Sequence, residues 1–361
     1  MTEKYYFPFL TERNEANQFV FTLNELYGRL GDAVSKEVFM CRVMYNLTYD
    51  YVYVRKMVDL TDYGKEFLGL LDSYSEQGAY IYGAGDRGDK IFRLYPDKKW
   101  IGYLDKKKEG TFNGLPVLSP DELDPKNNEA LIFISNRTRP AEIKEELIRR
   151  GFDEKRITTW NEWNKRAARD SYFDDSVFHD RRALAEGFFV DAGCFNGNNT
   201  VDYLRWMGDE SLHVAAFEAD VENIVNCKER LSGYENVQLI NVGLSDKQEE
   251  LHFKTSGSSS SFLKEGGENV VKTDTIDHVL QGKRVSFIKM DIEGFEEKAL
   301  RGASATITEQ KPALAISLYH KRDDILTIPK LILELNNNYR FYFRHYFLGS
   351  NETVLYAVNE E

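Results

Sequence analysis

The sequence predicts an α/β protein in which a seven-stranded, doubly wound sheet with an antiparallel terminal hairpin follows a smaller α/β domain and a helical N-terminal arm. Three observations lead to this fold class. Short apolar strands alternate with helix-forming segments in two parts of the chain, each part begins with a strand that enters a glycine-bearing loop, and the chain ends in two strand-forming segments around the turn LGSN. We expect four regions, namely a helical region at 1–76, a small α/β domain at 77–160, a linker helix at 161–185 and the large sheet domain at 186–361.

The first region is predicted to be helical because apolar and aromatic side chains recur there at intervals of three and four residues. Between Leu30 and Val58 this spacing fits an amphipathic helix or a pair of helices. The positions are Val34, Val38, Phe39, Val43, Leu47, Tyr51, Val54 and Val58. We interpret the region as an arm that packs on the next domain or on a second subunit. The tyrosine-rich stretch YNLTYDYVYV leaves a sugar-stacking surface as the alternative.

The small domain opens with a glycine-bearing loop between a strand and a helix. In AYIYGAGDRGDKIF, Gly83, Gly85 and Gly88 follow an apolar strand, and Asp105 ends the next strand about twenty residues later. This spacing matches the fingerprint of dinucleotide-binding loops. Asp86, however, stands where a pyrophosphate would approach the helix N-terminus, and its charge would repel the phosphates.

At about 85 residues, this stretch is short for a complete dinucleotide-binding domain. It resembles the small Rossmann-like unit at the front of sugar O-acyltransferases. Three roles stay open for it: a structural or acceptor-positioning module, a site for a nucleotide-linked sugar, or a working NAD site. The charged, helix-prone segment that follows, residues 161–185, is predicted to link the two sheets.

The segment FFVDAGCFNGNNT, residues 188–200, carries the strongest indication of a cofactor site. A short apolar strand ends in Asp191 and enters a loop with Gly193 and Gly197, where the lack of side chains lets the backbone approach a ligand. An acid just before the first glycine suits a cationic or zwitterionic ligand better than a pyrophosphate. A second acid, Glu218 in AAFEAD, ends the next apolar run and can accept hydrogen bonds from ribose hydroxyls. S-adenosylmethionine fits both features, with Asp191 near its amino-acid and sulfonium end.

The strands downstream bring further polar groups to the same sheet edge. LINVGL runs into Ser245 and Asp246, which suit the adenine edge, and VSFIKMDIEGFEEKALRGA is a buried strand that ends in Asp291 and opens a helix. ALAISLYHKRDD delivers His320 to the carboxyl edge, where parallel sheets place their ligand sites. The predicted cofactor contacts are Asp191, Gly193, Asn196, Gly197, Thr200, Glu218, Ala219, Ser245, Asp246 and Asp291.

In chain order, the segments DAGCFNGNNT, FEAD, VGLSD, KTDTID, IKMDIEGFEEKALRGA and SLYHKRDD resemble the FkbM-type methyltransferases. The resemblance covers roughly residues 186 to 358, and the terminal hairpin is similar to that of the seven-stranded methyltransferase sheet. It implies S-adenosylmethionine as the cofactor and O-methylation of a sugar hydroxyl in a glycoconjugate, a surface polysaccharide or a nucleotide-linked sugar. The alternative is a nucleotide-sugar or dinucleotide-binding protein, or an oxidoreductase, centred on the loop from Gly83 to Gly88.

A sugar hydroxyl is a poor nucleophile at neutral pH, so methyl transfer to it needs a base within hydrogen-bond reach or a metal that lowers its pKa. His320 is the predicted base, because the ordinary pKa of imidazole lies near neutrality. Asp291 and Glu293 share one strand-to-helix turn and can both face the opening of the site. They could contact the methionine end or the acceptor, orient His320, or hold a divalent metal together with His320; the metal is not favoured, because a dedicated metal motif is absent. Lys289 is expected to point inward and to pair with an acid.

Two other segments receive more modest interpretations. The polar tract TSGSSSSF, residues 255–262, is predicted to be a loop near the substrate entrance, with hydroxyl contacts to a sugar or phosphate as the sharper alternative. Cys194 lies inside the cofactor loop, but no histidine stands beside it, so we reject a nucleophilic role for this thiol.

The composition of the chain limits the classes of partner that it is expected to bind. A net charge of −12 argues against general nucleic-acid binding, which rewards clustered lysine and arginine. The sequence has neither an apolar run long enough to span a membrane nor a basic-then-apolar leader, and its three cysteines show no paired spacing, which suits a reducing compartment. We therefore expect a soluble cytoplasmic enzyme that acts on a sugar or glycoconjugate acceptor, and a homo-oligomer stays open.

Overall fold

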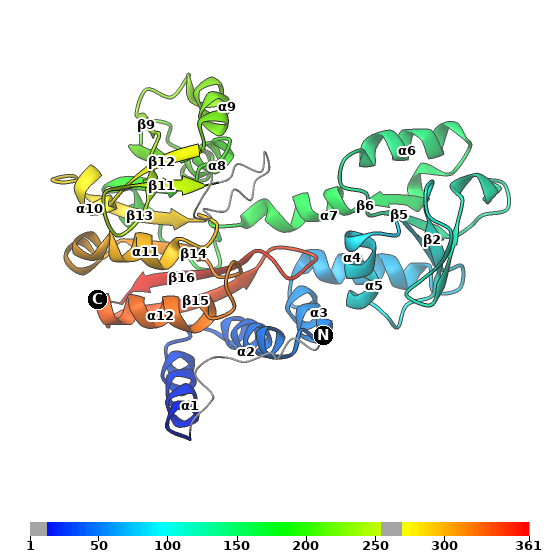
Figure 1. Cartoon of the computed structure of the whole chain (residues 1–361), viewed down its shortest axis with the longest axis horizontal. Helices are drawn as coiled ribbons and strands as arrows, with labels where there is room; N and C mark the ends of the chain where they lie inside the picture. The colour runs from blue at the N-terminus through cyan, green and yellow to red at the C-terminus, as the bar shows by residue number, and fades with distance from the viewer. Residues whose placement is uncertain (1–12, 254–268, 361) are drawn as a thin grey trace. The chain divides into compact units, whose positions relative to one another are not determined.

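The computed structural model describes residues 13–253 and 269–360, and the predicted polar loop at 255–262 lies outside them. The chain divides into two compact units. The large unit takes in the chain up to Phe39, Asp170–Arg344 and the chain from Glu352 onward, and the small unit takes in Met40–Arg169 and His345–Asn351. Each unit is built around its own sheet (Figure 1).

The large unit contains a seven-stranded sheet, as predicted. The strands run in the order β15-β16-β14-β13-β7-β8-β9. Neighbouring strands among β7, β8, β9, β13 and β14 are parallel, whereas β16 pairs antiparallel with β14. The bounds are β7 Phe188–Ala192, β8 Val214–Phe217, β9 Val237–Ile240, β13 Val285–Met290, β14 Ala313–Ser317, β15 Tyr339–His345 and β16 Thr353–Asn359. The predicted fold class is therefore confirmed.

The inner strands of this sheet are apolar on both faces. Every residue of β13, VSFIKM, is buried, as is every residue of β8, VAAF. Such continuous burial is typical of parallel strands that helices cover on both sides. The edge strand β15 instead alternates buried and half-buried residues. The helices of this unit are α1 Arg13–Gly28, the first part of α2 Ala33–Thr48, α8 Asn198–Met207, α9 Val221–Leu231, α10 Ile276–Val279, α11 Glu296–Arg301 and α12 Asp324–Leu335, with a π-helical turn at Thr306–Gln310.

A second, three-stranded sheet in the large unit has the order β10-β12-β11. Its strands are β10 Gly243–Leu244, β11 Glu249–Phe253 and β12 Asn269–Asp274. β10 pairs parallel and β11 antiparallel with β12. This small sheet carries the chain from β9 to α10, the helix before β13.

Aromatic rings fill the core between β7, β13 and α8. Phe189 of β7 stacks on Tyr203 of α8 with ring centroids 4.1 Å apart, and its ring lies 5.3 Å from Phe287 of β13. Phe173, from the segment predicted to be a linker, packs edge-on against Phe189 and Phe287. Burial of such rings strongly favours the folded state and holds α8 on the sheet. The loop that joins β7 to α8 is thereby fixed at both ends.

The N-terminal arm contacts the edge of the large sheet. Leu30 forms a parallel bridge with Phe341 of β15, and the Gly31 amide donates a 2.8 Å hydrogen bond to the Phe341 carbonyl. Arg344 donates a 2.7 Å hydrogen bond to Asp32. These contacts satisfy part of the exposed edge of β15, which would otherwise present unpaired backbone groups.

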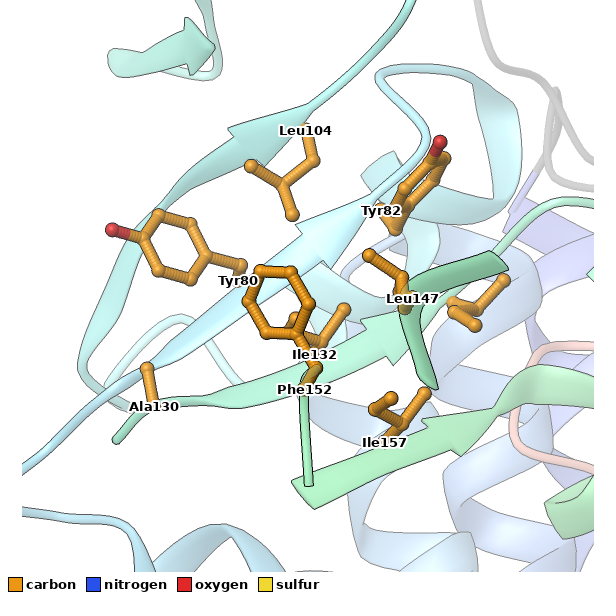
Figure 2. Close-up of a cluster of buried hydrophobic side chains, with 9 residues drawn as sticks. Tyr80, Tyr82, Leu104, Ala130, Ile132, Leu147, Phe152 and Ile157 are labelled. Carbon is orange, nitrogen blue, oxygen red and sulfur yellow. The ribbon is translucent and has the colours of Figure 1, made fainter. Parts of the chain in front are cut away.

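The small unit has a six-stranded sheet in the order β3-β4-β2-β1-β5-β6. Its strands are parallel except for the β3–β4 pair. The elements are α3 Tyr51–Asp59, α4 Asp62–Ser73, β1 Ala79–Tyr82, α5 Asp86–Leu94, β2 Trp100–Leu104, β3 Gly110–Phe112, β4 Leu115–Leu118, β5 Leu131–Ile134, α6 Pro140–Arg149, β6 Ile157–Thr159 and α7 Trp160–Ala167. One core cluster, drawn in Figure 2, consists of Tyr80, Tyr82, Leu104, Ala130, Ile132, Ile134, Leu147, Phe152 and Ile157. Leu147 reaches this cluster from α6, so the cluster holds that helix against the sheet.

The compact units divide the chain differently from the regions that we expected. The helical region at 1–76 is split, because the chain up to Phe39 belongs to the large unit while α3 and α4 belong to the small unit. Phe67 of α4 explains the second assignment, since its buried ring lies 5.5 Å from Phe133 of β5 and 4.9 Å from Trp163 of α7. The expected linker helix is also shorter than 161–185: α7 ends at Ala167, and only 3-10 turns at Ala168–Asp170 and Arg182–Ala185 follow it.

Within the described ranges, no helix combines the length and the apolar character needed to cross a bilayer.

Candidate active site

A cavity of about 270 Å³ opens at the carboxyl ends of the strands of the large sheet. It lies at the point where the strand order reverses around β7, the usual ligand position in doubly wound sheets. The lining residues come from the loops that follow β7, β8, β9, β13 and β14 and from the turn before β16. They are Gly193, Phe195, Asn199, Phe217, Glu218, Ala219, Asp220, Asn223, Val242, Gly243, Leu244, Asp291, Ile292, Glu293, Phe295, Tyr319 and Glu352.

The glycine at the start of the cofactor loop is required by the protein's own backbone. Gly193 has φ +77°, and a Cβ atom there would lie 2.1 Å from the Asp291 carbonyl oxygen. Gly197 has φ +78°, and its Cβ would press on Leu231 at 3.1 Å. We expected these glycines to allow a ligand to approach. In the structure the close approach is to β13 and α9, so the loop is packed against its neighbours before any ligand binds.

Asp191 lies beneath this loop. Its side chain is fully buried, with one oxygen 3.0 Å from Lys289 Nζ and the other accepting a 2.7 Å hydrogen bond from the Thr200 hydroxyl. Lys289 also donates to the Gly193 carbonyl at 2.8 Å. Burial alone would lower the pKa of Lys289, but the charges of Asp191 and Asp291 outweigh it and raise that pKa. Asp191 and Thr200 support the loop and do not line the cavity, and their direct contact with a cofactor stays a prediction.

Glu218 stands at the end of β8 and lines the cavity. One oxygen accepts a 2.9 Å hydrogen bond from the Phe195 amide and the other accepts a 2.8 Å bond from the Asp220 amide. Burial raises the pKa of Glu218, and these amides oppose that effect. The Asn223 side-chain amide also donates a 3.4 Å hydrogen bond to the oxygen that accepts from the Asp220 amide. The oxygen that accepts from the Phe195 amide keeps a second lone pair, with which Glu218 can accept a hydrogen bond from a diol such as ribose.

Of the other predicted cofactor residues, Gly193, Ala219 and Asp291 line the cavity, whereas Asn196 and Gly197 do not. Ser245 and Asp246 are also absent from the lining: Ser245 is fully buried and its hydroxyl donates a 3.1 Å hydrogen bond to the Asp246 carboxylate. The residues just before them, Val242, Gly243 and Leu244, form this wall of the cavity instead. The adenine-edge contact of Ser245 and Asp246 stays a prediction, and the residues that the structure places in this wall are their apolar neighbours.

Sequence reasoning missed several lining residues. Asp220 lies two residues after Glu218 and caps α9 by accepting from the Glu222 and Asn223 amides, so the N-cap pattern could have revealed it. Glu352 comes from the turn before β16, and nothing in the sequence around it indicates that it would face the cavity. Tyr319 and Phe295 are aromatic neighbours of predicted residues, and only the tertiary structure turns them into the lining.

Asp291, Glu293, Glu296 and His320 form a cluster at the β13 and β14 end of the cavity. His320 Nε2 lies 3.4 Å from an oxygen of Asp291 and 3.4 Å from an oxygen of Glu293, while Nδ1 lies 3.0 Å from Glu296. The turn that brings these acids together is unusual, because Glu293 has φ +56° and is followed by Gly294 with φ +95°. The structure thus brings the three predicted catalytic residues together and adds Glu296 to them.

Protonation of the cluster differs from our expectation of a neutral imidazole. Burial lowers the pKa of His320, but Glu296, Asp291 and Glu293 raise it more strongly, to about 9. Burial raises the pKa of Glu293 to about 7, with His320 opposing and Asp291 reinforcing the effect. At neutral pH His320 is then protonated and cannot accept a proton. Its side chain is also buried and does not line the cavity.

Two tyrosines hold Asp291 in place. The Tyr172 hydroxyl donates a 2.9 Å hydrogen bond to one Asp291 oxygen, and the Tyr319 hydroxyl donates a 3.1 Å bond to the other. Tyr172 also shares a 3.0 Å hydrogen bond with Ser317 at the end of β14. Nearby Glu352 is buried enough for its pKa to rise to about 8, and the charge of Asp291 adds to this shift. The carboxylate of Asp291 is therefore oriented by tyrosines from two separate segments.

Cys194 forms a close pair with Cys227 of α9. The two sulfurs are 3.6 Å apart, and both cysteines are buried and unoxidised. The contact with Cys227 and burial raise the pKa of Cys194 well above its ordinary value. A thiol held protonated in this way is a weak nucleophile, in agreement with our rejection of a catalytic role.

In the small unit, the glycine loop has the expected strand-to-helix geometry. Gly83 has φ +116°, and a Cβ atom on Gly88 would lie 2.1 Å from the Gly83 carbonyl oxygen, so both positions require glycine. The carboxylate of Asp105 accepts hydrogen bonds from the Ala84 amide at 3.1 Å and from the Lys107 amide at 2.9 Å. Asp105, which stands where the fingerprint has a ribose-binding acid, thus accepts hydrogen bonds from the protein's own backbone.

Residues 191–341 match the family model described as the methyltransferase FkbM domain. The match covers less than half of the chain and lies in the large unit. It supports methyltransferase activity for this part of the protein, as the resemblance in the sequence implied. A comparison with curated protein sequences gave no match.

The chain is similar at low sequence identity to several solved structures, three of which follow. A methyltransferase FkbM from Methylobacillus flagellatus is 18% identical, with 82% of this chain and 99% of that chain covered and a TM-score of 0.45. An rRNA methylase from Streptococcus thermophilus is 17% identical, with 53% and 100% covered and a TM-score of 0.35. A methyltransferase from Podospora anserina, bound to S-adenosylhomocysteine, is 13% identical, with 63% and 89% covered and a TM-score of 0.30.

Proposed function

We propose that this protein is an S-adenosylmethionine-dependent methyltransferase that methylates a hydroxyl oxygen of a sugar, in a glycoconjugate, a surface polysaccharide or a nucleotide-linked sugar. The observation that carries the proposal is the position of Glu218. It ends the strand next to β7, lines a cavity at the switch point of the sheet, and belongs to the segment that matches the FkbM domain. The sugar acceptor rests on the resemblance of the sequence to that family.

The charges of the cavity support this cofactor. Five lining side chains are carboxylic acids, namely Glu218, Asp220, Asp291, Glu293 and Glu352, and no lysine or arginine lines the cavity in the described part of the chain. S-adenosylmethionine carries a net positive charge, which such a cavity favours, whereas a pyrophosphate would be repelled. When bound, it supplies a methyl group on a sulfonium leaving group. The carboxylates that line the cavity therefore fit the cofactor.

The order of the strands separates the cofactor side from the acceptor side. Glu218, Asn223 and Leu244 come from the β8 and β9 side of β7, whereas Glu293 and Tyr319 come from the β13 and β14 side. Carboxylate oxygens accept hydrogen bonds from neighbouring hydroxyls, and an aromatic ring offers a face to the apolar side of a sugar. We therefore assign the acceptor to the second side.

On the acceptor side, we assign the removal of the acceptor's hydroxyl proton to a carboxylate that can reach this hydroxyl. Glu293 and Asp291 line the cavity and His320 does not, so the carboxylates can touch the acceptor directly. His320 contacts both of them and is better suited to position them. A base must be within hydrogen-bond reach of the proton that it removes, which favours Glu293 over our predicted base His320. The enzyme then aligns the hydroxyl with the methyl group, and this alignment supplies much of the rate.

The cofactor assignment can be tested with S-adenosylhomocysteine and the full-length protein. We expect isothermal titration to show one binding site. Glu218→Gln should weaken binding about tenfold, because an amide offers the ribose hydroxyls a poorer acceptor and the loss of a hydrogen bond to a charged group costs on the order of 1.5 kcal/mol. Glu210→Gln, which changes an exposed acid before β8, is the matched control and should bind normally. Absence of binding to the unchanged protein, or equal affinity in both variants, would refute the assignment.

A further inference from the structure

The cluster behind the cavity contains buried polar atoms that lack hydrogen bonds. Both nitrogens of His320 and one carboxylate oxygen of Glu296 are buried and have no hydrogen-bond partner within the described residues. The side chains are 4% and 1% exposed. The 3.0 Å contact between them is an ion-pair distance whose angles fall outside hydrogen-bond geometry. Buried polar atoms without partners are rare in native proteins, and an ion that is bound at the site is one explanation for them.

The same atoms converge on one small volume. Asp291, Glu296 and His320 each offer one ligand atom, and these atoms all lie within 4.8 Å of one another. Around a divalent cation with bonds of about 2.1 Å, adjacent ligands lie roughly 3 Å apart and opposite ligands roughly 4.2 Å apart. Small side-chain movements, with release of the proton that His320 carries in the absence of a metal, would therefore close the cluster around a cation. The oxygen of Glu293 that lies 3.4 Å from His320 Nε2 is a further carboxylate at this place.

The charge of the cluster also calls for a cation. Asp291, Glu293 and Glu296 surround a single imidazole. Lys289 cannot fully neutralise these carboxylates, because it forms its ion pair with Asp191. Lys321 is exposed to solvent. Even a protonated His320 supplies a single positive charge to these carboxylates, and buried charges are costly unless they are paired or coordinate a metal.

We propose that Asp291, Glu296 and His320 form a binding site for one divalent cation of the magnesium or manganese class, beside the acceptor side of the cavity. Oxygen ligands with one imidazole suit such ions, and Mn²⁺ accepts this mixed set readily. The Tyr172 and Tyr319 hydroxyls that bond to Asp291 would orient this ligand, as outer-shell groups do in metal sites.

Metal binding itself is independent of the proposed methyl transfer. A role in the reaction rests on the proposed function, because a cation here would lower the pKa of the acceptor hydroxyl next to Glu293. Asp291 would then serve both sites, since it lines the cavity and belongs to the metal cluster.

The test is titration of full-length protein, stripped with a chelator, with MnCl₂, followed by calorimetry and by the loss of the free-ion signal in electron paramagnetic resonance. We expect one site. Glu296→Gln and His320→Ala should each weaken Mn²⁺ binding at least tenfold, and His179→Ala, at an exposed histidine, should not. Titration of every variant with S-adenosylhomocysteine checks that the large unit is folded. If His320→Ala fails this check, Mn²⁺ binding is compared in Glu296→Gln and His320→Gln instead.

Two results would overturn the proposal. If the unchanged protein does not bind Mn²⁺, protonated His320 itself balances the carboxylates. If it binds Mn²⁺ with the same affinity after Glu296→Gln and His320→Ala, the ion lies elsewhere. Either result can occur while S-adenosylhomocysteine still binds, and Mn²⁺ can bind where S-adenosylhomocysteine does not, so failure of this proposal and failure of the proposed function are distinguished.

Discussion

Replacement of Lys289 by methionine tests whether the ion pair beneath the cofactor loop stabilises the large unit. The Lys289 and Asp191 side chains are 1% and 0% exposed, so Lys289→Met leaves a carboxylate buried without its cation. Breaking a buried pair in this way costs about 3–5 kcal/mol. The variant also loses the hydrogen bond to the Gly193 carbonyl, so we expect weaker binding of S-adenosylhomocysteine in addition to lower stability.

The assay is urea unfolding followed by far-UV circular dichroism, with hydrogen exchange of the β7 and β13 amides to assign the loss to the large unit. The double variant Asp191→Asn with Lys289→Met removes both charges and should recover part of the stability. The matched control is Arg284→Met, since the Arg284–Glu186 pair is 58% and 60% exposed and should contribute about 0–1 kcal/mol. A loss below about 1 kcal/mol in Lys289→Met, or a double variant that is no more stable than the single one, would refute this reasoning.

Two further predictions concern the small unit. Burial, and then the charge of Arg42, lower the pKa of His345 to about 3, below its ordinary value of 6.5. Below pH 6.5, His345 therefore binds a proton in the unfolded chain but not in the folded unit. The free energy of unfolding should keep its full value above about pH 6.5 and fall as the pH drops towards 3, by roughly 4–5 kcal/mol in all. A His345→Gln variant whose unfolding free energy depends on pH as steeply as that of the unchanged protein would contradict this. A Cβ atom on Gly85 would meet nothing within 4 Å, so Gly85→Val should fold normally and keep its affinity for S-adenosylhomocysteine, while losing any binding of a nucleotide-linked sugar such as a uridine-diphosphate hexose. If calorimetry shows equal sugar-nucleotide binding before and after this change, the Gly83–Gly88 loop does not frame that site.

Sequence patterns were sufficient to predict the features that depend on residues close together in the chain. The alternation of buried strands and helices predicted the parallel sheet, because period and burial follow directly from side-chain type. The terminal hairpin was predicted for the same reason, and the structure adds that β16 pairs antiparallel with β14. The ends of β8 and β13 placed Glu218 and Asp291 at one sheet edge, since parallel strands bring their carboxyl ends together.

Side-chain direction and pairing required the tertiary structure. Asp191 stands in the sequence where a cofactor-binding acid is expected, but a lysine 98 positions away turns it into a buried ion pair. His320 arrives at the predicted strand end, yet three carboxylates around it raise the pKa of its imidazole to about 9. Neither effect is local, because each depends on charges that distant segments bring within 3 to 4 Å.

The sequence by itself determined the fold class of this protein and the edge of the sheet at which the cavity lies, because both follow from local periodicity and from the geometry of parallel strands. Only the tertiary structure decided which polar groups line the cavity and which lie behind it. It placed Glu352, from the turn before the last strand, in the lining, and it left His320 and Glu296 buried together. Burial and electrostatic interaction are properties of the assembled environment, so they cannot be read from the spacing of residues along the chain.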